Sequence, residues 1–87
     1  MSITRGQQSN IKVCDASIIV TNTFEATIRH RLTCTETIVP ITAHMSCQCV
    51  LFTFDLDCAD FDSGFHSITI TDTTTSTEIT TLTTYIN

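Results

Sequence analysis

The chain has 87 residues, of which 41% are hydrophobic, and four Lys and Arg against nine Asp and Glu give a net charge of −5. This length predicts one domain, 1–87, with a shallow core, and the hydrophobic fraction excludes a disordered chain. Only Arg29 and Arg31 lie close together as cations, so we expect no nucleic-acid partner. No segment resembles an export signal or a membrane span, so we expect synthesis in a cytoplasm and no membrane partner.

The N-terminal third begins with a polar stretch, and we expect residues 1–10 to form an N-terminal arm. Residues 11–21 follow as the first strand, with apolar positions at Ile11 and at residues 18–20. The apolar alternation changes phase near Asp15, which predicts a β-bulge or two shorter strands.

Residues 23–33 have the clearest strand pattern in the chain, because apolar and polar side chains alternate along the whole segment. One face carries Phe24, Ala26, Ile28, His30 and Leu32, and the other carries Glu25, Thr27, Arg29, Arg31 and Thr33. This pattern predicts a half-buried strand in a sheet with one solvated face.

The middle of the chain contains a weaker and a stronger strand pattern. Residues 35–42 form the weaker one, and Pro40 restricts it to an edge or a bend because proline cannot donate to a ladder. Residues 45–56 are the best candidate for a central strand. One face carries Val50, Phe52, Phe54 and Leu56, and the other carries Met45, Cys47, Cys49 and Leu51.

The C-terminal third reads as an acidic connection at 57–64, a strand at 65–71, a turn at 72–77 and a last strand at 78–86. Threonine alternates with apolar residues in both strands, as suits the solvent face of a sheet. With no helical segment between the strands, the whole pattern predicts an all-β fold, a small antiparallel β-sandwich or barrel of about six strands.

The acidic segment offers a candidate calcium site. Its carboxylates could supply the oxygen ligands that Ca²⁺ prefers, at Asp55, Asp57, Asp60 and Asp62. The spacing departs from the EF-hand loop, which needs Gly at its sixth position and Glu at its twelfth. The alternative is a solvated loop whose Asp residues end the strands, and in that case the chain needs no cofactor.

Five cysteines form the second candidate group. Cys47 and Cys49 are two residues apart on one expected strand and so share a face, with Cys34 and Cys58 elsewhere. The favoured interpretation is buried thiols, because cysteine packs as a small apolar residue. A disulfide formed after synthesis, or a metal, are the alternatives, although structural zinc more often uses Cys-x-x-Cys.

The histidines complete the set of reactive groups. We expect His30 and His66 to be strand-end or hydrogen-bonded core residues rather than ligands or catalytic groups. Neither a cysteine-enzyme signature nor a nucleophile elbow nor a phosphate-binding loop is present in the sequence. A β domain of this size also leaves little volume for a pocket, so we expect no enzymatic activity.

The last 25 residues carry a resemblance to a known class of protein. After the Gly64-Phe65 step come a strand, Asp72, a Thr-rich turn and a final strand that ends at Asn87. This order resembles the closing hairpin of small β-sandwich structural proteins of tailed bacteriophages. The resemblance implies a virion protein, a head decoration, connector or tail component, made in the host cytoplasm.

Two functions follow from these observations. The favoured one is a non-enzymatic structural protein that forms a homo-oligomer and packs against copies of itself and a larger virion protein, because a small core gains stability from buried neighbours. The alternative is a soluble binding module with a Ca²⁺ site in the 55–62 loop.

Overall fold

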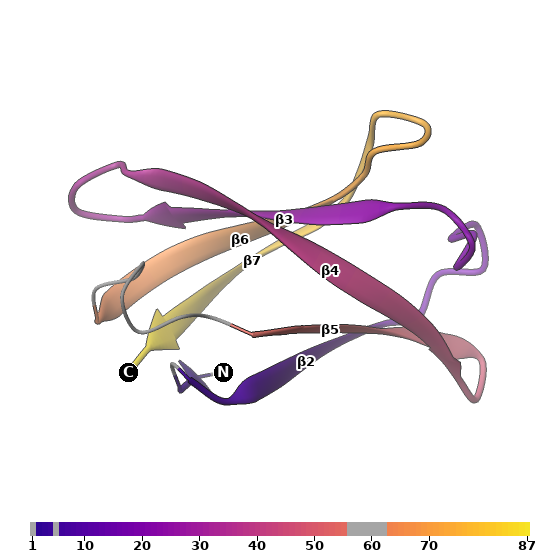
Figure 1. Cartoon of the computed structure of the whole chain (residues 1–87), viewed down its shortest axis with the longest axis horizontal. Coiled ribbons are helices and arrows are strands. Elements are labelled where there is room, and N and C mark those ends of the chain that lie inside the picture. Colours follow the sequence, from indigo (N-terminus) through magenta and orange to yellow (C-terminus); the bar gives the residue numbers. More distant parts are fainter. Residues whose placement is uncertain (1, 5, 56–62) are drawn as a thin grey trace.

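The computed structural model describes residues 2–4, 6–55 and 63–87, and these residues form an all-β fold that contains no helix. Six strands are longer than two residues, which confirms the predicted fold class. In chain order the strands are β1 (Ser2–Ile3), β2 (Gln8–Val13), β3 (Phe24–His30), β4 (Glu36–Ser46), β5 (Cys49–Asp55), β6 (Gly64–Asp72) and β7 (Thr77–Ile86) (Figure 1).

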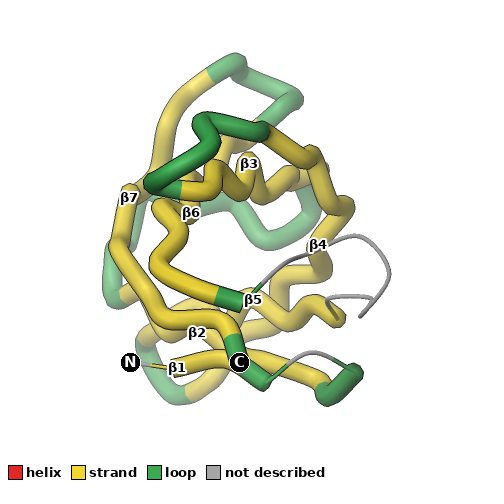
Figure 2. The backbone as a smooth tube through the Cα atoms, turned by 90° about the vertical axis from the view of Figure 1, so that its left-hand side faces the viewer, coloured by secondary structure: helices red, strands yellow, loops and turns green. Residues whose placement is uncertain are grey.

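The strands form one sheet in the order β1-β7-β6-β3-β4-β5-β2, and every neighbouring pair except the parallel β1–β7 pair is antiparallel. The sheet curls into a half-barrel, and the strands surround a common centre when seen from the side (Figure 2). Strand β4 connects the strands β1, β7, β6 and β3 to the strands β5 and β2, because its residues 36–41 pair with β3 and its residues 42–46 pair with β5. Strands β1 and β2 are the two ends of the order.

Pro40 lies inside β4, which is a central strand of the sheet rather than an edge. The backbone N–H of His30 donates to the carbonyl of Thr35, so in the β3–β4 ladder this pair is hydrogen-bonded, and hydrogen-bonded and non-hydrogen-bonded pairs alternate from there. The pair of Glu25 and Pro40 is a non-hydrogen-bonded one, so the nitrogen of Pro40 faces away from β3. Pairing with β5 begins only at Thr42, so the missing N–H removes no ladder bond. Pro40 therefore stands where β4 changes partners, as the bend interpretation predicts.

The core lies on the concave side of the curled sheet. Every strand contributes to it through alternate residues, as the period of two requires. Phe24 and Phe52 pack edge to face at its centre, with ring centroids 5.1 Å apart. The buried apolar residues are Ile3, Ile11, Ile18, Phe24, Ala26, Ile28, Ile41, Val50, Phe52, Phe54, Ile68, Ile70 and Ile86.

Strand β3 has the predicted buried face, except at its C-terminal end. Phe24, Ala26, Ile28 and His30 are buried, but Leu32 is 89% exposed. The strand ends at His30, and a turn then takes Leu32 out of the alternation. The prediction for Leu32 was therefore wrong, because the period of two holds only while the backbone stays extended.

The prediction of one strand over residues 45–56 was also wrong. A two-residue turn at Cys47 and Gln48 divides this segment between β4 and β5, which pair with each other in register Ser46↔Cys49. Cys47 has a φ of 57°, a value that usually favours glycine or asparagine, so the sequence carried no turn signal. The predicted apolar face is confirmed at Val50, Phe52 and Phe54, and its fourth residue, Leu56, lies outside the described residues.

The strands observed near the N-terminus differ from the predicted ones, whereas those near the C-terminus agree with the prediction. Residues 1–10 were expected to be an arm, but they contribute β1 and the start of β2. The first expected strand, 11–21, ends as β2 at Val13 and continues as a loop. The C-terminal hairpin is confirmed as β6 and β7, with the turn between them at residues 73–76.

Candidate functional site

The predicted calcium ligands fall almost entirely outside the described residues. Asp57, Asp60 and Asp62 are not described, and Asp55 is described only as the last residue of β5, opposite Gln8. Among the residues that the structure does describe, no group of three or more His, Cys, Asp or Glu side chains is placed to hold a metal ion. The calcium site stays a prediction.

His30 and His66 form a buried pair inside the sheet. His30 and His66 are directly opposite each other on β3 and β6, and their rings meet edge to face with centroids 4.5 Å apart. The Nδ1 of His30 accepts hydrogen bonds from the backbone N–H groups of Leu32 and Thr33, and the Nδ1 of His66 donates to the carbonyl of Gly64. The prediction of hydrogen-bonded core histidines is confirmed.

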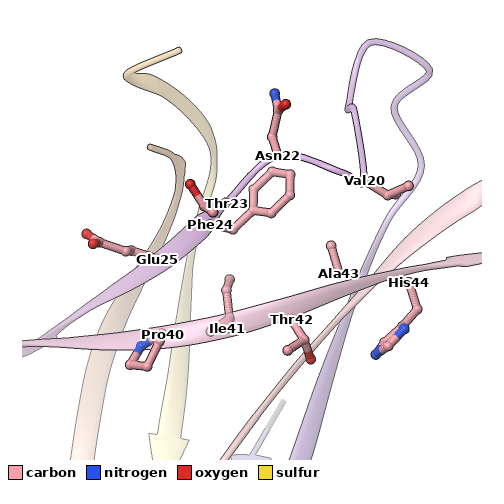
Figure 3. Close-up of a pocket in the computed structure, with 10 residues that line it drawn as sticks. All are labelled: Val20, Asn22, Thr23, Phe24, Glu25, Pro40, Ile41, Thr42, Ala43 and His44. Atoms are coloured by element: carbon pink, nitrogen blue, oxygen red, sulfur yellow. The ribbon is translucent and has the colours of Figure 1, made fainter. Parts of the chain in front are cut away.

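A hollow of about 530 Å³ opens where β4 leaves β3 and turns toward β5. Its floor is apolar: Phe24, Ile41 and Ala43 point into it, and Val20 closes one side (Figure 3). His44 points to the other side of β4, away from this floor, as the strand alternation requires (Figure 3). The lining residues therefore bring no acid–base pair together, and the hollow suits an apolar group of modest size.

The cysteines do not behave as buried thiols. Cys14, which directly follows β2, forms a disulfide with Cys49, the first residue of β5, and Cys34 and Cys47 are free and exposed. The predicted buried thiols were therefore wrong for these residues, and the disulfide alternative holds for Cys49. The sequence carries no local signal that singles out Cys14, because only the pairing of β2 with β5 brings it opposite Cys49. Cys58 lies outside the described residues.

The outer edge of β2 is an open edge at one end of the strand order. Cys14 and Cys49 have Cα atoms 4.1 Å apart, a spacing typical of a non-hydrogen-bonded antiparallel pair. Every second pair back along the β2–β5 ladder is therefore also non-hydrogen-bonded. The backbone N–H and C=O groups of Gln8, Asn10 and Lys12 belong to such pairs and point away from β5. No described strand pairs with that side of β2. This edge was not predicted, because residues 1–10 were expected to be an arm, whereas residues 8–10 begin β2.

An exposed aromatic pair lies on the outer face near the other end of the sheet. Phe65 on β6 and Tyr85 on β7 are directly opposite each other, and their rings meet edge to face with centroids 5.1 Å apart. Phe65 is 60% exposed. The backbone of Arg31 donates to the carbonyl of Phe65, which brings the turn that carries exposed Leu32 beside the pair.

Comparisons with protein-family models, with curated proteins and with solved structures found no match for this chain. Within the described ranges, the chain forms no helix of the length and hydrophobicity that a membrane crossing requires.

Proposed function

We propose that this chain is a non-enzymatic structural protein that packs against copies of itself. The observation that carries this proposal is the unpaired outer edge of β2, a row of hydrogen-bonding groups at Gln8, Asn10 and Lys12. Such an edge is a ready template for strand addition, and soluble monomers usually guard it with charges, prolines or bulges. On β2, Lys12 is the one charged side chain that could disfavour such strand addition.

The expected contact is antiparallel addition of a strand from a second copy to β2. Main-chain hydrogen bonds would then continue the curled sheet from one subunit into the next. The aromatic pair Phe65 and Tyr85 offers a second contact surface, because large exposed aromatic side chains are enriched at the centres of protein interfaces. Together the two surfaces give one subunit a contact along the edge of β2 and another on the outer face of β6 and β7.

The particle to which we assign the protein is a virion, where it serves as a head decoration, connector or tail component beside a larger virion protein. This part of the proposal is supported by the resemblance of the C-terminal hairpin to small structural proteins of tailed bacteriophages. The synthesis of the chain in the host cytoplasm belongs to the same proposal.

Substitution at Lys12 tests the edge contact, because its backbone N–H points outward. Lys12→Pro removes that donor without breaking a bond to β5, whereas Lys12→Ala removes the side chain and keeps the donor. We expect the wild type and Lys12→Ala to sediment as oligomers and Lys12→Pro to sediment as a folded monomer. Oligomers that persist in a folded Lys12→Pro variant, or a monomeric wild type, would contradict the proposal.

The calcium-binding module remains the alternative, and it makes a separate prediction. Exchange of Asp57→Asn together with Asp60→Asn would then abolish a calcium-dependent rise in melting temperature. A melting temperature that does not respond to calcium in the wild type would end this alternative.

A further inference from the structure

Three cysteines gather at one end of the β4–β5 hairpin. The disulfide partners Cys14 and Cys49 and the free Cys47 line the same shallow hollow of about 590 Å³, together with Met45 and Gln48. Only Gln48 separates Cys47 from Cys49, so their Cα atoms lie at most about 7 Å apart. A free thiol and a disulfide therefore share one surface site.

Each member of this group is in the state that thiol–disulfide exchange requires. Cys47 is exposed, so its sulfur is open to solvent and to bases that remove its proton. Cys14 is the exposed member of the disulfide, whereas Cys49 is half-buried. Exposed disulfides are the labile ones in proteins, because an attacking thiolate can approach them.

We propose that Cys47 and the Cys14–Cys49 disulfide form a thiol–disulfide exchange site. The Cys47 thiol gives its proton to solvent, and its thiolate attacks Sγ of Cys14. The Cys14–Cys47 bond forms as the Cys14–Cys49 bond breaks, and Cys49 leaves as a thiolate that takes up a proton. One disulfide and one thiol are present before and after, so the step needs no oxidant or reductant.

The exchange changes the residue to which the C-terminal end of β2 is covalently bonded. Cys14 directly follows Val13, the last residue of β2, and in the observed form it is bonded to the first residue of β5. After exchange it is bonded to the β4–β5 turn, and Cys49 becomes a thiol. The site thus has two covalent forms that hold the end of β2 differently, whether or not β2 binds a second copy.

Maleimide labelling followed by fragment mass spectrometry tests the exchange. Cys58→Ser serves as the background, since residue 58 lies outside the described chain. The protein is held at mildly alkaline pH for increasing times, quenched with acid and labelled. We expect the label to begin on Cys34 and Cys47 and then to appear on Cys49 with a matching loss at Cys47, faster at higher pH because the thiolate is the nucleophile.

Cys34 provides a matched control. It is free and exposed like Cys47 and has nearly the same backbone angle, φ 58° against 57°, but it precedes β4 whereas Cys47 follows it. Labelling of Cys49 should therefore persist in Cys34→Ser and be lost in Cys47→Ser. Label confined to Cys34 and Cys47 at all times would overturn the proposal, as would a rate that falls on dilution, which would make the exchange intermolecular.

A second variant tests the product directly. With Cys49→Ser in the same background, reoxidation should give one disulfide between Cys14 and Cys47, and Cys34 should remain the sole labelled residue. A variant that keeps three reactive thiols after reoxidation would show that Cys47 does not reach Cys14, and it would overturn the proposal independently of the kinetics.

Discussion

The side chain of Asn22 donates a 2.8 Å hydrogen bond to the carboxylate of Asp72, and this bond joins two turns that are 50 residues apart in the chain. Asp72 ends β6 and is 5% exposed. It also accepts hydrogen bonds from the backbone N–H groups of Thr74 and Thr75, so one carboxylate organises the β6–β7 turn and attaches the loop before β3 to it. Buried carboxylates are retained where such donors replace water.

The stability of the fold should fall in acid because of Asp72. The hydrogen bond from Asn22 lowers the pKa of Asp72 below its ordinary value of 3.8, and the N–H groups of Thr75 and Thr74 add to it against the cost of burial. A lowered folded-state pKa gives stabilisation that is present above the ordinary value and is lost as the pH falls through the folded-state pKa. Urea unfolding at a series of pH values measures this loss.

The matched variants for this pH effect are Asp72→Asn and Asn22→Ala. Asp72→Asn should be less stable at neutral pH and should show a shallower loss in acid, and Asn22→Ala should reduce the same acid dependence in part. Acid slopes identical to that of the wild type in both variants would show that Asp72 is not the group responsible.

Truncation of Phe52 should test the core of the half-barrel. Phe52 is fully buried and packs edge to face on Phe24. Phe52→Ala should cost about 3–5 kcal/mol, a large share of the roughly 4–13 kcal/mol expected for a domain of this length. Phe65→Ala, at an exposed position, should change the free energy of unfolding by less than about 1 kcal/mol. Equal losses in denaturant unfolding would contradict this placement of the core.

The turn between β6 and β7 should accept glycine at Ser76. Ser76 has a φ of 56°, a left-handed conformation that glycine adopts without strain. Ser76→Gly should therefore raise the free energy of unfolding by about 0.5–1 kcal/mol. Ser76→Ala keeps a Cβ at the same angle and should give no gain. A stabilisation shared by both variants would point to loss of the hydroxyl rather than to relief of the backbone.

Gly64 should resist substitution because of the histidine pair. Its φ is 137°, and a Cβ at this position would stand 3.2 Å from Nε2 of His30. Gly64→Ala should destabilise the fold by about 1–3 kcal/mol, through backbone strain and through this contact. In a double-mutant cycle with His30→Ala, the contact part should disappear and the strain part should remain. Simple additivity of the two changes would show that His30 plays no part.

Strand β3 and the β6–β7 hairpin could be predicted from the sequence, because alternation and turn chemistry agree there. Phe24, Ala26 and Ile28 alternate with polar residues, and Asp72 begins a turn that its own carboxylate stabilises. Local and tertiary preferences point the same way in these segments, so the pattern alone was sufficient.

The β4–β5 hairpin could not be predicted in the same way. Its turn places Cys47 in a conformation that glycine usually supplies, and the apolar alternation runs on through it. Pairing of β2 with β5 also decides the partner of Cys14, and such pairing between distant segments leaves no local signal. The disulfide and the open edge of β2 could not be predicted for the same reason, because both depend on strand pairing that only the structure provides.

A native mass spectrum of the purified chain, recorded without reductant or chelator, is the decisive test of assembly, since it reads subunit number and bound metal together. We expect a metal-free oligomer for the wild type and for Lys12→Ala, and a monomer for Lys12→Pro. A folded wild-type monomer at every protein concentration would contradict assembly through the β2 edge. If that monomer carried one divalent ion, the acidic 55–62 loop would become the site to study.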